Sequence, residues 1–133
     1  MSQNEIKILL RTHNLRATPA RVAVLSYLHK QKHPVGIQSI GSSVPGTNPT
    51  TIYRMIDDFV QSGIVHGHDL GHGHNDYEIA DRPHHHHLVC ESCGLIEDID
   101  CNRQEYGSIL TKTSFSKITH HQTTYFGTCK KCS

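Results

Sequence analysis

Apolar residues in the first half of the chain recur every three or four positions, which is the period of a helix buried along one side. A first helix is expected after Ser2, because Ser2 and Glu5 form an S-x-x-E capping box. A second helix is expected after Thr18, whose side chain can cap a helix with Pro19 at its first position. A short third helix is expected over residues 37–43.

A fourth helix is predicted to begin at Pro49, because Asn48 supplies the same cap-plus-proline signal and Gly63 supplies a stop. Its buried face is expected to carry Ile52, Ile56, Phe59 and Val60. Two short strands, at 64–68 and 77–80, should follow, joined by a glycine-rich loop. Helices followed by a hairpin predict a winged helix-turn-helix domain over residues 1–80.

The pattern changes after residue 80, and residues 81–83 form a predicted hinge. The expected order after the hinge is strand 84–90, strand 95–99, helix 101–113 and strand 116–127. These elements predict a second, small α/β domain over residues 84–133. The predicted fold class is therefore α/β (α+β), with a winged helix-turn-helix domain followed by this small domain.

Charge differs between the two halves. Residues 1–65 carry seven Lys or Arg and three Asp or Glu, a net +4, whereas residues 66–133 carry six and nine, a net −3. The first half is compatible with a polyanionic partner. The second half is acidic and holds ten of the thirteen histidines, a composition that suits cations.

Several classes of protein are not favoured by the sequence. No apolar run approaches the roughly 20 residues that a membrane span requires, and the start of the chain lacks a signal-peptide pattern. We therefore expect a cytoplasmic protein with no membrane partner. A zinc hydrolase would need an open metal position, a general base and a pocket. No HExxH motif or Ser/His/Asp order is present, so we expect no enzyme and no small-molecule substrate.

The cysteines form two CxxC pairs, which are Cys90/Cys93 and Cys129/Cys132. Thiols stay reduced in the cytosol, where paired cysteines are more often metal ligands than disulfides. Four thiolates form a closed tetrahedral set, so the pairs predict a structural Zn²⁺ site, with a redox dithiol as the alternative. The unpaired Cys101 is expected at the start of a helix, with a ligand or redox role as the alternative.

Four consecutive histidines precede the first CxxC pair. In a strand, neighbouring side chains point to opposite faces, so His84 and His86 should share one face and His85 and His87 the other. Two residues on a face do not complete a metal site, so each face must recruit further ligands. The candidates are Glu78, Asp98, Glu105, His120 and His121. This ligand chemistry suits Zn, Fe(II), Mn, Ni or Co without choosing among them.

Five stretches of the chain form an ordered set: LRATPARVAVL (15–25), HPVGIQSI (33–40), TTIYRMIDDFVQSGIV (50–65), YEIADRPHHHHLVCESCG (77–94) and HQTTYFGTCKKC (121–132). In this order and spacing they resemble the ferric uptake regulator family of bacterial metalloregulators, over essentially the whole chain. The resemblance implies a winged-helix DNA-binding domain joined to a dimerisation domain. The expected partners are therefore a second copy of the chain and double-stranded DNA with an AT-rich inverted repeat.

The resemblance also implies roles for individual residues. It assigns structural zinc to the four paired cysteines. It assigns a regulatory divalent metal to His33, Glu78, His85, His87 and Asp98. It assigns an additional metal site to His84, His86, Glu105 and His121. DNA contacts are expected from the helix over 49–62, where Tyr53 and Arg54 face away from the apolar stripe. The expected contact residues are Arg16, Thr50, Thr51, Tyr53 and Arg54.

The expected function is that of a metal-responsive repressor of metal-uptake genes, with a peroxide-sensing regulator or a metal-buffering protein as alternatives.

Three departures from the family pattern bear on the ligands. The segment after His33 is one residue longer than in members where this histidine binds metal. His86 stands where many iron-type members have aspartate, which favours zinc, but no cysteine lies near Glu78 as in some zinc sensors. The regulatory metal therefore stays open among Fe²⁺, Zn²⁺ and Mn²⁺.

Overall fold

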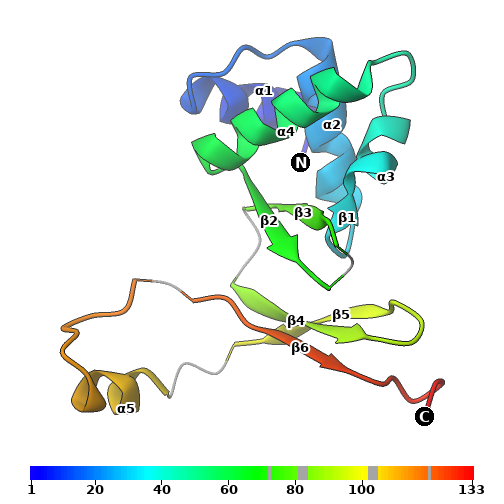
Figure 1. The fold of residues 1–133 in the computed structure, drawn as a ribbon. Helices are drawn as coiled ribbons and strands as arrows, with labels where there is room; N and C mark the ends of the chain where they lie inside the picture. Colours follow the sequence, from blue (N-terminus) through cyan, green and yellow to red (C-terminus); the bar gives the residue numbers. More distant parts are fainter. Residues whose placement is uncertain (72, 81–83, 102–104, 120) are drawn as a thin grey trace. The chain divides into compact units, whose positions relative to one another are not determined.

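The chain folds into two compact units, Met1–Arg82 and Pro83–Ser133, in the computed structural model shown in Figure 1. The structure describes residues 1–71, 73–80, 84–101, 105–119 and 121–133, with the backbone alone at Glu105. The hinge predicted at 81–83 lies outside the described residues. None of the described helices is long and apolar enough to cross a membrane.

The first unit combines helices with a small antiparallel sheet. Its elements are α1 (Gln3–Thr12), α2 (Pro19–Lys30), β1 (Val35–Gly36), α3 (Ile37–Ser42), α4 (Pro49–Ser62), β2 (Val65–Asp69) and β3 (Asn75–Ile79). The strand order is β1-β3-β2. The pattern did not predict β1, because a strand of two residues has no periodicity of its own. It is made by pairing with β3, where Val35 lies opposite Tyr77.

Local signals place the helix ends where the sequence predicts them. The Ser2 hydroxyl accepts a hydrogen bond from the backbone N–H of Glu5, and the Glu5 side chain accepts one from the backbone N–H of Ser2. Asn48 caps α4 by accepting from the backbone N–H of Thr50 at 2.7 Å. Gly63 ends α4 with φ of 85°, a left-handed conformation that costs little only for glycine.

A single hydrophobic core lies between the helices and β2. Phe59, Ile6 and Leu25 are among its fully buried side chains. The expectation that Val60 is buried was wrong, because its side chain is 40% exposed and Met55 is buried instead. At 3.6 residues per turn, Val60 is rotated about 80° from Ile52, at the edge of the apolar stripe.

The second unit is a three-stranded sheet with one described helix, which lies beyond one end of the sheet (Figure 1). Its elements are β4 (His85–Cys90), β5 (Ile96–Asp100), α5 (Glu105–Lys112) and β6 (Thr124–Gly127), and the strand order is β5-β4-β6. β4 is antiparallel to β5 and parallel to β6. Among the described residues of the strand expected over 116–127, only the last four form a strand, because pairing with β4 begins where Thr124 meets His87.

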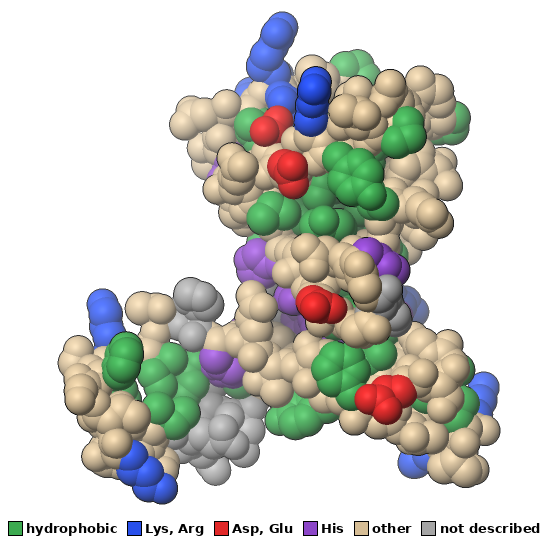
Figure 2. Space-filling view, in the orientation of Figure 1, with side chains coloured by type: hydrophobic (Ala, Val, Ile, Leu, Met, Phe, Trp, Pro, Cys, Tyr) green, Lys and Arg blue, Asp and Glu red, His purple; other side chains and the backbone are tan. Residues whose placement is uncertain are grey.

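The second unit has very little apolar core. Among its described residues, only Val89 and Cys90 are buried hydrophobic side chains, and they lie beside the buried His86 and His87. Leu88, Tyr125 and Phe126 are exposed instead, and hydrophobic side chains are visible on the surface of this unit in Figure 2. So small a core is marginal without metal or oligomerisation.

Candidate metal centres and DNA-facing helix

The four paired cysteines come together at one end of the β5-β4-β6 sheet. Cys90 ends β4, and a tight turn that includes Gly94, with φ of 79°, leads to β5. The second pair follows β6, which lies alongside β4. The four sulfur atoms all lie within 4.8 Å of one another, and the Sγ atoms of Cys93 and Cys129 are 3.7 Å apart.

Hydrogen bonds within this four-cysteine cluster shift the pKa values of two of its thiols in opposite directions. The backbone N–H of Cys129, which donates to Cys90 Sγ at 3.3 Å, is the main cause that lowers the pKa of Cys90 to about 6. The neighbouring Cys129 and Cys93 side chains raise the pKa of Cys132 to about 12. Four adjacent thiols cannot all ionise unless a cation compensates their charges.

The cluster has the dimensions of a zinc site. With Zn–S bonds of about 2.3 Å, the edge of a regular tetrahedron of sulfur atoms is about 3.8 Å. The measured 3.7 Å between Cys93 and Cys129 is close to this value. The donor set and geometry therefore fit a closed, structural Zn²⁺ ion that leaves no position for a substrate.

The odd-numbered histidines of β4 form a second cluster with β5. His87 lies opposite Asp98 in the strand register, which puts both side chains on one face of the sheet. His85 Nε2 and His87 Nε2 are 3.1 Å apart, and His87 Nε2 is 3.6 Å from Asp98 Oδ1. His87 is only 2% exposed. The structure thus brings together three of the five residues expected to hold the regulatory metal.

The other two expected regulatory ligands, Glu78 and His33, belong to the first unit. Glu78 is buried in β3 at 5% exposure, and its Oε1 lies 2.8 Å from His68 Nε2. His33 is exposed in the loop before β1. His68 was not among the ligand candidates taken from the sequence. His68 lies in β2 two residues after His66, and His66 pairs with Glu78. His68 therefore shares the face of the sheet that carries Glu78.

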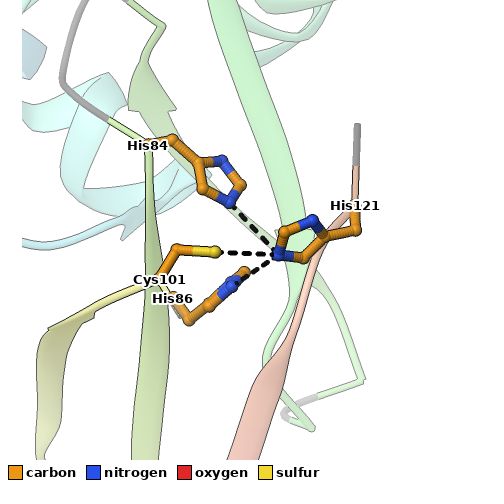
Figure 3. Close-up of side chains that lie close together, drawn as sticks. All are labelled: His84, His86, Cys101 and His121. Carbon is orange, nitrogen blue, oxygen red and sulfur yellow. Dashed lines mark hydrogen bonds between the residues drawn. The ribbon is translucent and has the colours of Figure 1, made fainter. Parts of the chain in front are cut away.

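His84, which directly precedes β4, and His86 of β4 meet His121 on the other face of the sheet (Figure 3). His121 Nε2 lies 3.3 Å from His84 Nε2 and 2.8 Å from His86 Nε2. Burial, followed by the nearby His121, lowers the pKa of His86, which keeps its ring in the neutral form that binds metal. Three of the four residues expected here are therefore together. The side chain of the fourth, Glu105, lies outside the described part of the chain.

The exposed face of α4 carries the residues expected to contact DNA. Thr50, Thr51, Tyr53 and Arg54 are all exposed, and Arg16 is exposed at the approach to α2. The next turn of α4 carries Asp57 and Asp58, and Asp58 forms an ion pair with Arg21 at 3.4 Å. Phosphates would be repelled by that acidic turn, so the N-terminal half of α4 is the half suited to DNA.

Comparison with known proteins agrees with this arrangement. The profile of the Ferric uptake regulator family matches residues 12–126 of the chain. The chain belongs to the ferric uptake regulator family. Members of this family are metal-responsive regulators of transcription.

Individual members of the ferric uptake regulator family match along most of their length. The ferric uptake regulation protein of Legionella pneumophila is 26% identical over 129 residues, which cover 92% of this chain and 95% of that protein. The peroxide-responsive repressor PerR of Staphylococcus aureus (strain Mu50) is 31% identical over 129 residues, which cover 92% and 86%.

Among solved structures, the Helicobacter pylori ferric uptake regulator Fur, described as having three functional metal-binding sites, superposes with a TM-score of 0.82 at 22% identity, over 99% of this chain and 94% of that one. This likeness confirms the predicted fold class.

The structure also brings Cys101 close to the even-numbered histidines and His121. From the sequence, a ligand role for Cys101 was only the alternative to a position at the start of a helix. Cys101 was expected at the start of a helix, but it directly follows β5, and α5 begins at Glu105. Its Sγ lies 3.1 Å from His121 Nε2 (Figure 3). The strand register could have revealed this position, because continuing the pairing of His85 with Asp100 by one residue sets Cys101 opposite His84.

Proposed function

We propose that the protein is a homodimeric transcriptional repressor that binds DNA when its regulatory divalent metal is bound and controls metal-uptake genes. The observation that carries the proposal is the division of four consecutive histidines, His84 and the first three residues of β4, between two ligand clusters on opposite faces. A buffering protein would also use such clusters, but it would have no use for a winged-helix unit with an exposed, capped helix. Membership of a regulator family supports the same choice.

The four-cysteine cluster would hold the structural zinc. Its ligands would be Cys90, Cys93, Cys129 and Cys132, which come from turns that follow two parallel neighbouring strands. The ion would supply the tertiary stability that the small apolar core of this unit lacks.

The regulatory site would be formed by His85, His87 and Asp98 of the second unit, together with Glu78 and His33 of the first. Support comes from the close approach of the three second-unit ligands to one another. A metal bound by ligands from both units would favour one arrangement of the two winged-helix domains of the dimer. The metal can raise DNA affinity only if it binds this arrangement more tightly than the others. The coupling free energy between the two binding events is typically about 1–3 kcal/mol.

The DNA contacts would come from the N-terminal half of α4. Arg54 would bind a guanine edge or a phosphate, and Tyr53 a thymine methyl group or a phosphate. Thr50 and Thr51, in the first turn of α4, would bind phosphate, as would Arg16. Dimerisation through the second unit would cover exposed apolar residues such as Leu88 and Tyr125, which are paired across β4 and β6. The two winged-helix domains of the dimer would then bind the two half-sites of an AT-rich inverted repeat.

Fluorescence anisotropy with a labelled AT-rich inverted-repeat duplex tests this proposal. The exchangeable metal is removed with a mild chelator, the zinc content of the four-cysteine site is verified, and titrations are run with no metal, Zn²⁺, Mn²⁺ or anaerobic Fe²⁺. We expect tight binding only with metal, and loss of the metal effect in His87→Ala. A duplex with one scrambled half-site is the control. Binding that is independent of metal would refute the repressor mechanism.

A peroxide-sensing regulator is a second candidate, favoured by the 31% identity to PerR of Staphylococcus aureus. The same assay separates the two candidates. Hydrogen peroxide added to the Fe²⁺-loaded complex should release the duplex from a peroxide sensor, with the Mn²⁺-loaded complex unaffected. A metal-uptake repressor should stay bound in both cases.

A further inference from the structure

We propose that the thiolate of Cys101 is a ligand of the metal site formed by His84, His86 and His121, which makes it a tetrahedral site of three nitrogens and one sulfur that selects zinc. The proposal rests on the proposed function only for the existence of a metal on this face of the sheet. Figure 3 shows the four side chains pointing toward one another from β4, the end of β5 and the segment before β6.

The convergence of four metal-binding atoms is difficult to explain by hydrogen bonds alone. His121 Nε2 lies within 3.3 Å of His84 Nε2, 2.8 Å of His86 Nε2 and 3.1 Å of Cys101 Sγ. A neutral imidazole nitrogen carries either one proton or one lone pair, so it makes one well-directed hydrogen bond of this kind. Three groups nevertheless point at this one atom. A cation between the four atoms would satisfy all of them at once.

A contact behind His121 prepares this ring for metal binding. The Tyr106 hydroxyl is hydrogen-bonded to His121 Nδ1, on the side of the ring away from the cluster. If the Nδ1–H donates to the phenol oxygen, the tautomer is fixed and the Nε2 lone pair faces the other three ligands. Metal-binding histidines usually have such a partner on the second nitrogen. Tyr106 is therefore a positioning residue for this site.

The burial of His86 is a second observation that favours a cation at this cluster. His86 is 6% exposed, and its Nδ1 atom has no hydrogen-bond partner among the described residues. Its Nε2 atom points into the cluster. Burial of an imidazole with half of its hydrogen-bonding capacity unused is costly unless the other nitrogen is strongly bound.

The four atoms need little rearrangement to hold zinc. With Zn–N bonds of about 2.0–2.1 Å and a Zn–S bond of about 2.3 Å, the tetrahedral edges are about 3.3–3.4 Å between nitrogens and about 3.6 Å between nitrogen and sulfur. The ligand atoms all lie within 4.8 Å of one another, and the contacts of His121 Nε2 with the other three are shorter than these edges by at most about half an ångström. Small side-chain rotations would open the cluster to the size of the ion.

A sulfur ligand changes which metal this site prefers. Thiolate is a soft ligand that favours zinc, whereas carboxylate ligands suit Mn²⁺. A site with Glu105 as its fourth ligand would accept either ion. A site with Cys101 would accept tetrahedral Zn²⁺ or Co²⁺ and discriminate against Mn²⁺. The identity of the fourth ligand is therefore the point to be tested.

Cobalt(II) spectroscopy on the full-length protein identifies that ligand. Zinc is kept in the four-cysteine cluster, the exchangeable metal is removed, and Co²⁺ is added under reducing, anaerobic conditions. Sulfur bound to cobalt gives a charge-transfer band in the near ultraviolet, and nitrogen and oxygen ligands do not. We compare the wild type with Cys101→Ser and with the matched control Glu105→Gln, and zinc content is measured before and after each titration.

We expect the charge-transfer band in the wild type and in Glu105→Gln and its loss in Cys101→Ser, with Co²⁺ binding weakened at least about tenfold. An equally strong band in Cys101→Ser, or no band in the wild type, would overturn the assignment of Cys101. The DNA anisotropy assay is run on the same samples. If the wild type shows the charge-transfer band but no metal-dependent DNA binding, the repressor proposal is refuted. The assignment of Cys101 as a metal ligand is then still supported.

Discussion

Loss of the structural zinc should unfold the second unit and leave the first unit folded. The substitution Cys93→Ser tests this, because Cys93 is an exposed member of the four-cysteine cluster. Replacing an exposed thiol by a hydroxyl removes no buried apolar surface. Any large effect would therefore come from the lost metal ligand rather than from lost packing.

The size of the effect follows from the composition of the core. The buried hydrophobic residues among the described part of the second unit are Val89 and Cys90. Burying a side chain such as valine contributes about 1.5–3 kcal/mol. Structural zinc contributes about 10–16 kcal/mol in small zinc domains, and a whole domain is stable by only about 5–15 kcal/mol. Apolar burial in this unit therefore cannot replace the ion.

Hydrogen exchange followed by mass spectrometry measures the effect in each unit separately. In Cys93→Ser, peptides from β4 and β6 should lose protection, whereas peptides from α2 and α4 should keep it, because the first unit has its own core. Ser92→Ala, in the same exposed turn, is the control and should retain both zinc and protection. If Cys93→Ser lost its zinc and β4 stayed protected, the claim that zinc stabilises this unit would be refuted.

Three further results are expected in the first unit. Phe59→Ala should lower the free energy of unfolding by about 3–5 kcal/mol in guanidinium denaturation, whereas Val60→Ala, at a 40% exposed position, should change it far less. Gly63→Ala should cost about 1 kcal/mol in the same assay, because alanine is strained at φ of 85° although the space around the position is open. Arg54→Ala should weaken DNA binding and reduce the slope of log K against log salt by about 0.9 if Arg54 binds phosphate. Arg11→Ala, an exposed change on α1, should leave that slope unchanged.

The helices of the first unit were predictable because their signals are local. A capping box at Ser2, a cap-plus-proline pair at Asn48 and a glycine stop at Gly63 each involve residues within one turn of each other. Helix periodicity was less reliable at the edge of the buried face, where it wrongly placed Val60 in the core. Neighbouring elements decide how wide that face is, and this information is not local.

The β-strands were predictable only where alternation was strong. β2, β3, β4 and β5 lie within two residues of their expected bounds. The first part of the expected strand over 116–127 was predicted wrongly and the short β1 was missed, because a strand exists only where a partner supplies hydrogen bonds. The partner of β1 is β3, about 40 residues further along the chain.

The sequence by itself determined the chemistry of this protein: the four cysteines for zinc, the alternation of the four histidines, and the capped helix for DNA. These follow from residue type and from the two-residue period of a strand, which hold for any tertiary arrangement. Only the tertiary structure decided which residues complete each face. Cys101 joins His84 and His86, and Asp98 joins His87, because the β4–β5 register brings them together. A register is set by packing between segments distant in sequence, so the spacing within one segment does not specify it.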